Sequence, residues 1–189
     1  MCRSARKPAS AIAAGQHWAR RDPVTSGRHL RAPELWVASF IVVADQVTKA
    51  LVRAKVPLYD SVNVIPGMLD ITHATNNGAA FGILNGVEFP HKAGVMVLVA
   101  VIALAAVGLY AVSLPSEQRM ARLGLALILG GACGNLVDRA TAGFVLDFVD
   151  VYWRAYHFWA FNVADSAITV GVAFMLLDVL GVRRAPKTV

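Results

Sequence analysis

The stretch FNVADSAITVGVAFMLLDVL, Phe161–Leu180, combines the two features on which the fold and the function of this chain depend. Most of its side chains are apolar, and a run of this length can cross a bilayer as a helix. Its first turn nevertheless carries Asn162 and Asp165, an amide and a carboxylate. Because polar groups are costly near lipid, the stretch predicts a membrane helix whose first turn belongs to a functional site.

The composition of the whole chain also indicates a membrane protein. Its 189 residues are 57% hydrophobic and 16% charged, whereas soluble domains carry about 25% charged residues. Helices satisfy every backbone hydrogen bond in lipid, and apolar runs of this length favour them. The sequence therefore predicts an all-α membrane protein with one domain at 34–182 and four transmembrane helices, at 35–52, 93–114, 123–139 and 161–182.

The distribution of Lys and Arg predicts how these spans are oriented. Twelve lie in the segments 1–33, 113–122 and 183–189, and five lie in the segments 53–92 and 139–160. Since basic residues favour the cytoplasmic side, both termini are expected there. We expect 1–33 to be a disordered basic extension and 183–189 a basic tail. The same pattern explains the net charge of +6 without a nucleic-acid partner.

Polar residues gather at the outer ends of the predicted spans. Within each helix they are spaced i,i+3 or i,i+4 and so share one face. They are Asp45 and Lys49 in the first span, Asn135 and Arg139 in the third, Asp147 in the segment after it, and Asn162 and Asp165 in the fourth. Three helices that place polar groups at one depth predict a functional site at the outer face.

The two carboxylates outside the first span suggest the chemistry of that site. If Asp147 and Asp165 lie close together, they share one proton, because both cannot ionise cheaply. The ionised carboxylate can then take a proton from water while the protonated one polarises a carbonyl, as in aspartic proteases. This chemistry requires no metal and no cofactor. Cys2 and Cys133 are far apart in the sequence and predict neither a zinc site nor a disulfide framework.

The residues alone leave other interpretations open. Ser166 with Lys49 as its base would make a serine hydrolase, although Ser166 points about 100° away from Asp165 around a helix. The charged residues can also be ion pairs that tie helices together in a membrane scaffold. A small proton-coupled transporter would bury Asp and Lys as well, but with polar residues spread through the membrane depth.

Five motifs, in order and with matching spacing, resemble lipoprotein signal peptidase, the signal peptidase II of bacteria. They are DQVTK (45–49), NNGAAFG (76–82), GGACGNLVDR (130–139), VLDFVDVY (145–152) and FNVADSAI (161–168), and the resemblance covers about residues 34–182. It implies a membrane aspartic endopeptidase that cleaves diacylglyceryl-modified prolipoproteins just before the lipidated cysteine. The enzyme would act in the bacterial inner membrane, with its active site at the extracytoplasmic face. We expect it to be a monomer.

The resemblance also implies roles for individual residues. Asp147 and Asp165 would be the catalytic pair. The substrate or the pair would be held by Asp45, Lys49, Asn76, Gly78, Phe81, Asn135, Arg139 and Asn162. The segment 53–92 has β-branched stretches broken by Pro66–Gly67 and Asn77–Gly78, which are turn signals. A small extracytoplasmic β-cradle around the substrate is therefore expected there.

Overall fold

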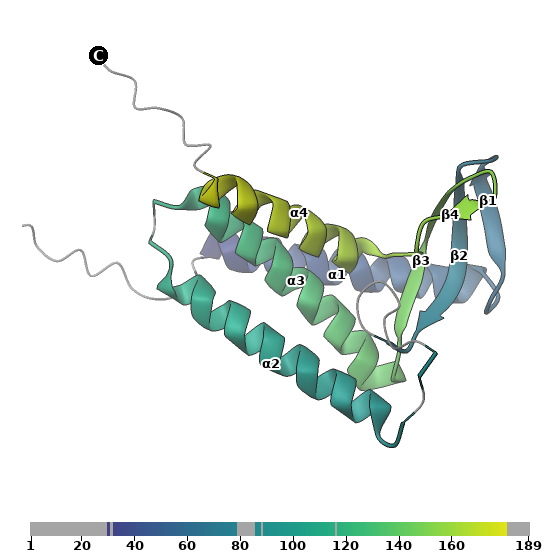
Figure 1. The fold of residues 1–189 in the computed structure, drawn as a ribbon, viewed down its shortest axis with the longest axis horizontal. Coiled ribbons are helices and arrows are strands. Elements are labelled where there is room, and N and C mark those ends of the chain that lie inside the picture. Colours follow the sequence, from purple (N-terminus) through teal and green to yellow (C-terminus); the bar gives the residue numbers. More distant parts are fainter. Residues whose placement is uncertain (1–29, 31, 79–85, 88, 116, 181–189) are drawn as a thin grey trace, which may run out of the picture.

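The computed structural model describes residues 30, 32–78, 86–87, 89–115 and 117–180. These residues form four helices and a four-stranded sheet (Figure 1). The helices are α1 (Ala32–Lys55), α2 (Lys92–Ser113), α3 (Arg119–Ala142) and α4 (Val163–Val179). The strands are β1 (Ser61–Ile65), β2 (Leu69–Asn76), β3 (Val145–Trp153) and β4 (Tyr156–His157).

Helix α3 is the centre of the helical bundle and packs against α1, α2 and α4. Small residues allow the closest of these contacts. Gly124 faces the backbone of Gly171, and Gly131 faces the backbone of Ala164, so that an added Cβ at either glycine would collide with α4. Small residues at such contacts let the backbones of membrane helices approach closely.

Three helices of the described part are long and apolar enough to cross a membrane: α1, α2 and α3. They confirm the first three predicted spans. Helices α1 and α3 are longer than predicted, and α2 has the predicted length. The fourth prediction, over 161–182, corresponds to α4, which has 17 residues. Four helices are therefore confirmed, and α4 is shorter than a span of about 20 residues.

The sheet lies at one end of the bundle, in the order β1-β2-β3-β4, and every neighbouring pair is antiparallel (Figure 1). The predicted turn at Pro66–Gly67 connects β1 to β2, and Gly67 has the positive φ of 78° that glycine tolerates. An all-α description was incomplete, since β3 and β4 arise from the segment 140–160, where only a connection was expected. The first four residues of β3 are all buried, so β3 lacks the alternation that reveals a strand.

The chain passes directly from α3 into β3. Gly143 ends the helix with φ 83°, a left-handed conformation that suits glycine at a helix C-terminus. The β3 residues Leu146 and Phe148 then pack with Val52 and Val56 at the end of α1. This cluster fixes the sheet against α1 and determines the position of Asp147, which lies between the two packed residues in the sequence.

Some sequence predictions concern residues outside the described part of the chain. These are Phe81, the tail 183–189 and nearly all of the extension 1–33. The predicted extension is also slightly too long, because α1 already begins at Ala32.

Candidate active site

The two polar residues at the start of α4 cap that helix. The Asn162 side chain accepts a hydrogen bond from the Asp165 backbone N–H at 2.9 Å, and the Asp165 carboxylate accepts one from the Asn162 N–H at 3.2 Å. This reciprocal capping box satisfies two donors that a helix N-terminus leaves free. A carboxylate is also favoured there by the helix dipole. The sequence NVAD thus holds Asp165 at the end of the helix, where it is half-buried.

Asp147 is held by amide groups from two other elements. Asn162 Nδ2 donates to Asp147 Oδ1 at 2.7 Å, and Asn76 Nδ2, at the end of β2, donates to Oδ2 at 3.2 Å. The side chain is buried, with 5% of its surface exposed. Burial, and then the negative charge of Asp165, raise the pKa of Asp147 to about 7, although both amides favour its ionised form.

Asn135 on α3 connects the two halves of the site. Its Nδ2 donates to Asp165 Oδ1 at 2.8 Å, and its Oδ1 accepts from Asn162 Nδ2 at 3.2 Å. The same oxygen accepts a hydrogen bond from Lys49 Nζ at 3.0 Å. One buried amide therefore links the carboxylates on β3 and α4 to a buried ammonium on α1.

Lys49 lies in a buried ion-pair network between α1 and α3. Its ammonium is 2.7 Å from Asp45 Oδ2 and 2.9 Å from Asp138 Oδ2, and all three side chains are at most 1% exposed. Arg53 adds a second cation, 2.9 Å from Asp138 Oδ1. Asp45 Oδ1 also accepts from the Ala164 backbone N–H at 3.0 Å, which joins the start of α4 to α1.

Arg139 contacts the backbone beside the site. Its guanidinium donates to the carbonyl of Gly78 at 2.8 Å and to that of Asn135 at 3.4 Å. The Gly78 N–H in turn donates to Asn76 Oδ1 at 3.0 Å. Arg139 is near enough for its charge to interact with Asp147 and Asp165, and no ion pair between them is present in the described part of the chain. Its direct effect is to hold the backbone that follows β2.

The structure brings together most of the residues predicted from the sequence. Only Phe81 cannot be placed, because it lies outside the described residues. Sequence reasoning missed the importance of Asp138, which binds Lys49, Arg53 and the Leu146 backbone N–H at 3.1 Å. Its signal was its position three residues after Asn135, on the same helix face.

The geometry does not support a serine nucleophile. Ser166 is exposed, and its hydroxyl donates to the Asn162 carbonyl of its own helix at 3.0 Å. Lys49 is fully buried and bound to Asp45, Asn135 and Asp138. Its ammonium is therefore committed to other partners. Among the described residues, no three His, Cys, Asp or Glu side chains meet as a metal site requires.

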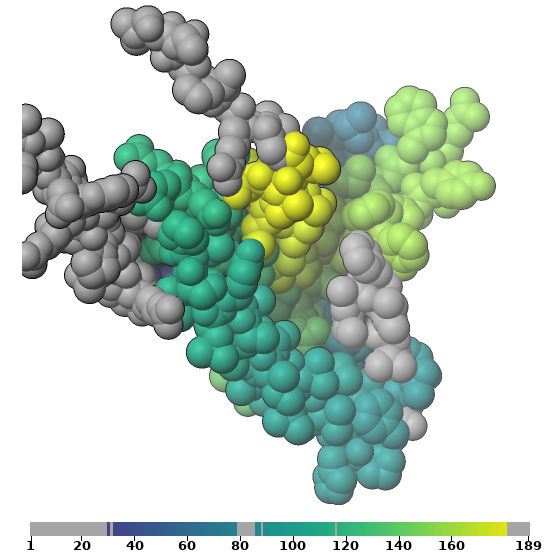
Figure 2. All heavy atoms as spheres, turned by 60° about the vertical axis from the view of Figure 1, so that its left-hand side comes forward, coloured from purple at the N-terminus to yellow at the C-terminus, as the bar shows by residue number. Residues whose placement is uncertain are grey.

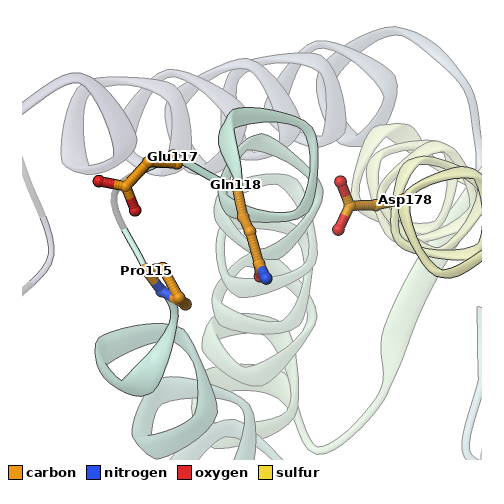
Figure 3. A pocket seen from close by; sticks show the side chains of 4 residues that line it. All are labelled: Pro115, Glu117, Gln118 and Asp178. Carbon is orange, nitrogen blue, oxygen red and sulfur yellow. The ribbon is translucent and has the colours of Figure 1, made fainter. Parts of the chain in front are cut away.

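The opposite end of the bundle is also polar, which the sequence interpretation did not foresee. Arg122 on α3 binds Glu34 on α1 through two nitrogens, at 2.7 and 2.9 Å, and donates to the Leu114 carbonyl at 3.0 Å. Beside this end, a hollow of about 380 Å³ is lined by Pro115, Glu117, Gln118 and Asp178. The Asp178 carboxylate points toward Gln118 across it (Figure 3). Because the sheet caps the other end of the helices, this hollow is separate from the Asp147–Asp165 site (Figure 1).

Comparison with known proteins identifies the family. A family model described as "Signal peptidase (SPase) II", of the peptidase A8 class, matches residues 37–181. The chain belongs to the signal peptidase II family. It is therefore an enzyme, an aspartic peptidase, and the resemblance drawn from its motifs is confirmed. The transporter and scaffold interpretations are superseded.

Individual members of the signal peptidase II family match most of the chain. A protein named lipoprotein signal peptidase from Geobacter metallireducens is 45% identical over 144 residues, which cover 76% of this chain and 88% of the relative. Another of that name, from Solibacter usitatus, is 46% identical over 163 residues, with coverage of 85% and 98%.

A solved structure supports the membrane fold. It is described as a bacterial membrane enzyme determined by the in meso method at 2.3 Å resolution. It matches with a TM-score of 0.73 and 32% identity, and covers 85% of this chain and 97% of that chain. This signal peptidase II is therefore a multi-pass bacterial membrane enzyme.

Proposed function

We propose that Asp147 and Asp165 are the catalytic pair of this signal peptidase, and that its substrates are prolipoproteins whose cysteine already carries a diacylglyceryl group. Cleavage just before that cysteine removes the signal peptide. One observation is the main support for assigning these two residues as the pair. Asn162 holds both carboxylates, since its amide binds Asp147 at 2.7 Å and its backbone N–H binds Asp165 at 3.2 Å.

The pair suits hydrolysis by a bound water. Because burial and the charge of Asp165 raise the pKa of Asp147 to about 7, the pair retains a shared proton up to about neutral pH. The ionised carboxylate takes a proton from water as the water oxygen attacks the scissile carbonyl carbon, and the protonated carboxylate donates to the carbonyl oxygen. The tetrahedral intermediate then collapses and the C–N bond breaks. The leaving nitrogen receives the proton taken from water, and the carboxylate that had donated to the carbonyl oxygen takes a proton back from a hydroxyl of the intermediate as the C=O bond re-forms.

The surrounding residues position this pair. Asn76, Asn135 and Asn162 orient the carboxylate oxygens through the hydrogen bonds described above. Asp45 and Lys49 fix Asn135 and the first turn of α4. The backbone at Gly78, held by Arg139, borders the substrate site, and Phe81 supplies an apolar substrate contact.

The site lies at the extracytoplasmic face of the bacterial inner membrane, and both termini are cytoplasmic. The concentration of Lys and Arg in the terminal segments and in the α2–α3 connection supports this orientation. We assign α4 as the fourth span because it packs along α3 over much of its length. Exposed aromatic residues near the sheet support an interfacial position. They include Trp153, Tyr156 and Trp159, in the light green segment that stands clear of the helices in Figure 2.

This position explains why the substrate is lipidated. A diacylglyceryl group anchors the scissile bond at the bilayer surface, at the depth of the outer helix ends. A carboxylate pair at that depth can reach the scissile bond while the peptide stays outside the hydrocarbon core. The carboxylate pair is held by polar partners of its own chain, so a second copy is not needed to position it.

Cleavage of a purified prolipoprotein in detergent tests the proposal. The substrate is compared with and without its diacylglyceryl group, for the wild type and for Asp165→Asn. We expect cleavage of the lipidated form only, and its loss in the variant. Equal cleavage of both forms would overturn the substrate assignment, and cleavage by a folded Asp165→Asn variant would overturn the catalytic pair.

A further inference from the structure

A shallow apolar groove lies along the junction of the outer end of α1 and the sheet, on the part of the molecule that no step of the reaction uses. Its volume is about 350 Å³. Leu51, Val52 and Val56 line it from α1 and the residue after it, and Val62, Ile71 and Phe148 line it from the sheet. Val52, Val56 and Phe148 pack together and form its floor. We call it the α1–sheet groove. We propose that it binds one acyl chain of a membrane phospholipid, with the Lys55 ammonium pairing with the lipid phosphate.

The groove is continuous with the lipid-facing side of α1. Trp36, Phe40, Val43, Val47 and Leu51 follow one another at intervals of three or four residues and are 51–75% exposed. Such a stripe lies along one face of a helix, and on a membrane helix an exposed apolar face contacts acyl chains. Leu51 belongs both to this stripe and to the groove, so an acyl chain that lies along α1 leads directly into it.

The next residue on that face is Lys55, which lies one turn beyond Leu51 and also lines the groove. The 24 residues of α1 span ~36 Å, against a hydrocarbon core of ~30 Å. The last turn of α1 therefore reaches the headgroup region. Among the described residues, none forms a hydrogen bond or an ion pair with the Lys55 side chain. A cation that lines an apolar groove fits a ligand with a phosphate and an acyl chain. A phospholipid has both groups, whereas a diacylglycerol lacks the phosphate.

Photo-crosslinking with the full chain in detergent tests the proposal. The probe is a phosphatidylglycerol that carries a diazirine on one acyl chain, and the labelled residues are located by mass spectrometry. We expect labelling of residues 51–56 and 62–71 to saturate and to be competed by unlabelled phosphatidylglycerol. Labelling of the exposed α2 residues Leu98 and Ile102 should instead rise in proportion to the probe. Groove labelling that follows the α2 pattern would mean general lipid contact and would overturn the proposal.

A matched pair of variants locates the bound chain. Val62 and Val64 lie on β1 and are 51% and 52% exposed, but only Val62 lines the groove. Val62→Trp should fill the groove and lower its labelling at least fivefold, whereas Val64→Trp should leave the labelling within twofold. Circular dichroism confirms that both variants are folded. Unchanged labelling in a folded Val62→Trp variant would overturn the proposal.

The headgroup is tested with a diacylglycerol that carries the same diazirine chain. It should label the groove at least fivefold less than the phospholipid probe at equal concentration. Lys55→Gln should remove this difference, and Lys55→Arg should keep it. Equal labelling by both probes would overturn the role of the phosphate. Displacement of the probe by a diacylglyceryl peptide but not by phosphatidylglycerol would assign the groove to the substrate instead.

Discussion

Four aspartates meet at the end of the bundle that the sheet caps (Figure 1), and they fall into two pairs with different partners. Asp45 and Asp138, between α1 and α3, bind the cations Lys49 and Arg53. Asp147 and Asp165, between β3 and α4, are held by the neutral amides of Asn76, Asn135 and Asn162. Asn135 joins the two pairs, since it binds both Lys49 and Asp165.

This difference supports the proposed division into structural and reactive carboxylates. A buried carboxylate paired with a cation stays ionised and has little tendency to accept a proton. A carboxylate held by amides, beside a second carboxylate, keeps an affinity for protons near neutral pH. The raised pKa of Asp147, to about 7, is the expected result of this second arrangement. We therefore expect Asp45 and Asp138 to stabilise the structure around the site, and Asp147 and Asp165 to exchange protons.

The strongest test of this division replaces one aspartate of each pair by asparagine. Asp147→Asn should lower kcat/KM by roughly 10³-fold or more, because a general acid–base group is lost. Asp138→Asn should instead lower the thermal stability, because Lys49 and Arg53 lose a shared anion. Peptide cleavage and thermal unfolding of the same preparations separate the two effects. A stable, fully active Asp147→Asn enzyme would remove the basis of the division.

The cation of the ion-paired half should matter for folding. Lys49→Met leaves Asp45 and Asp138 buried without their common ammonium, and removing one partner of a buried pair costs about 3–5 kcal/mol. Unfolding of the variant in detergent measures this loss. The double variant Lys49→Met/Asp45→Leu should recover part of the stability, because one unpaired charge is removed as well. No recovery would show that the ammonium stabilises the fold chiefly through Asp138 or Asn135.

The pH dependence of cleavage tests the amide-held half. Above about pH 7 the pair loses its shared proton, so kcat/KM should fall about tenfold per pH unit. Stability should follow the same group. Because the folded-state pKa is raised, the folded state binds the extra proton between about pH 4 and 7. The free energy of unfolding of the wild type should therefore fall as the pH rises from about 4 to 7. The Asp147→Asn variant should lack this decrease. A flat rate profile from pH 6 to 9 would contradict the assignment.

A smaller effect is expected at the edge of the site. Asn76 donates to Asp147 Oδ2 at 3.2 Å, a hydrogen bond that favours the ionised carboxylate. Asn76→Ala should therefore raise the pKa of Asp147 and move the alkaline limb of the rate profile to higher pH. Loss of one such bond costs about 1 kcal/mol, so the rate should fall about fivefold. A shift of the limb to lower pH would mean that Asn76 acts on another group.

The smallest effect is expected at Ser166, whose hydroxyl is exposed and bonded to its own helix. Ser166→Ala should keep cleavage within about twofold of the wild type, because surface changes of this kind have little effect. Complete loss of cleavage in this variant would restore the serine interpretation and overturn the comparison of the two aspartate pairs.

Much of this arrangement was predictable because it follows from local sequence. The α4 cap needs only Asn162 and Asp165, three residues apart, and the structure shows both hydrogen bonds of that cap. Asp45 and Lys49 lie one turn apart on one helix, and they form the ion pair that the sequence left open as an alternative to a functional site. The role of Asp138 was less predictable, because its partners are 85 to 89 residues away or lie on the following strand.

The sequence by itself determined the membrane helices, the polar groups gathered at one end of them and the family, because helix periodicity, hydropathy and short motifs are local properties of the chain. Only the tertiary structure decided which aspartates receive cations and which receive amides. That choice depends on the buried, four-residue start of β3 and on its packing against α1, which bring Asp147 beside Asn162 and leave Asp138 beside Lys49. Contacts between distant segments set the electrostatic environment of a carboxylate, and no local pattern records them.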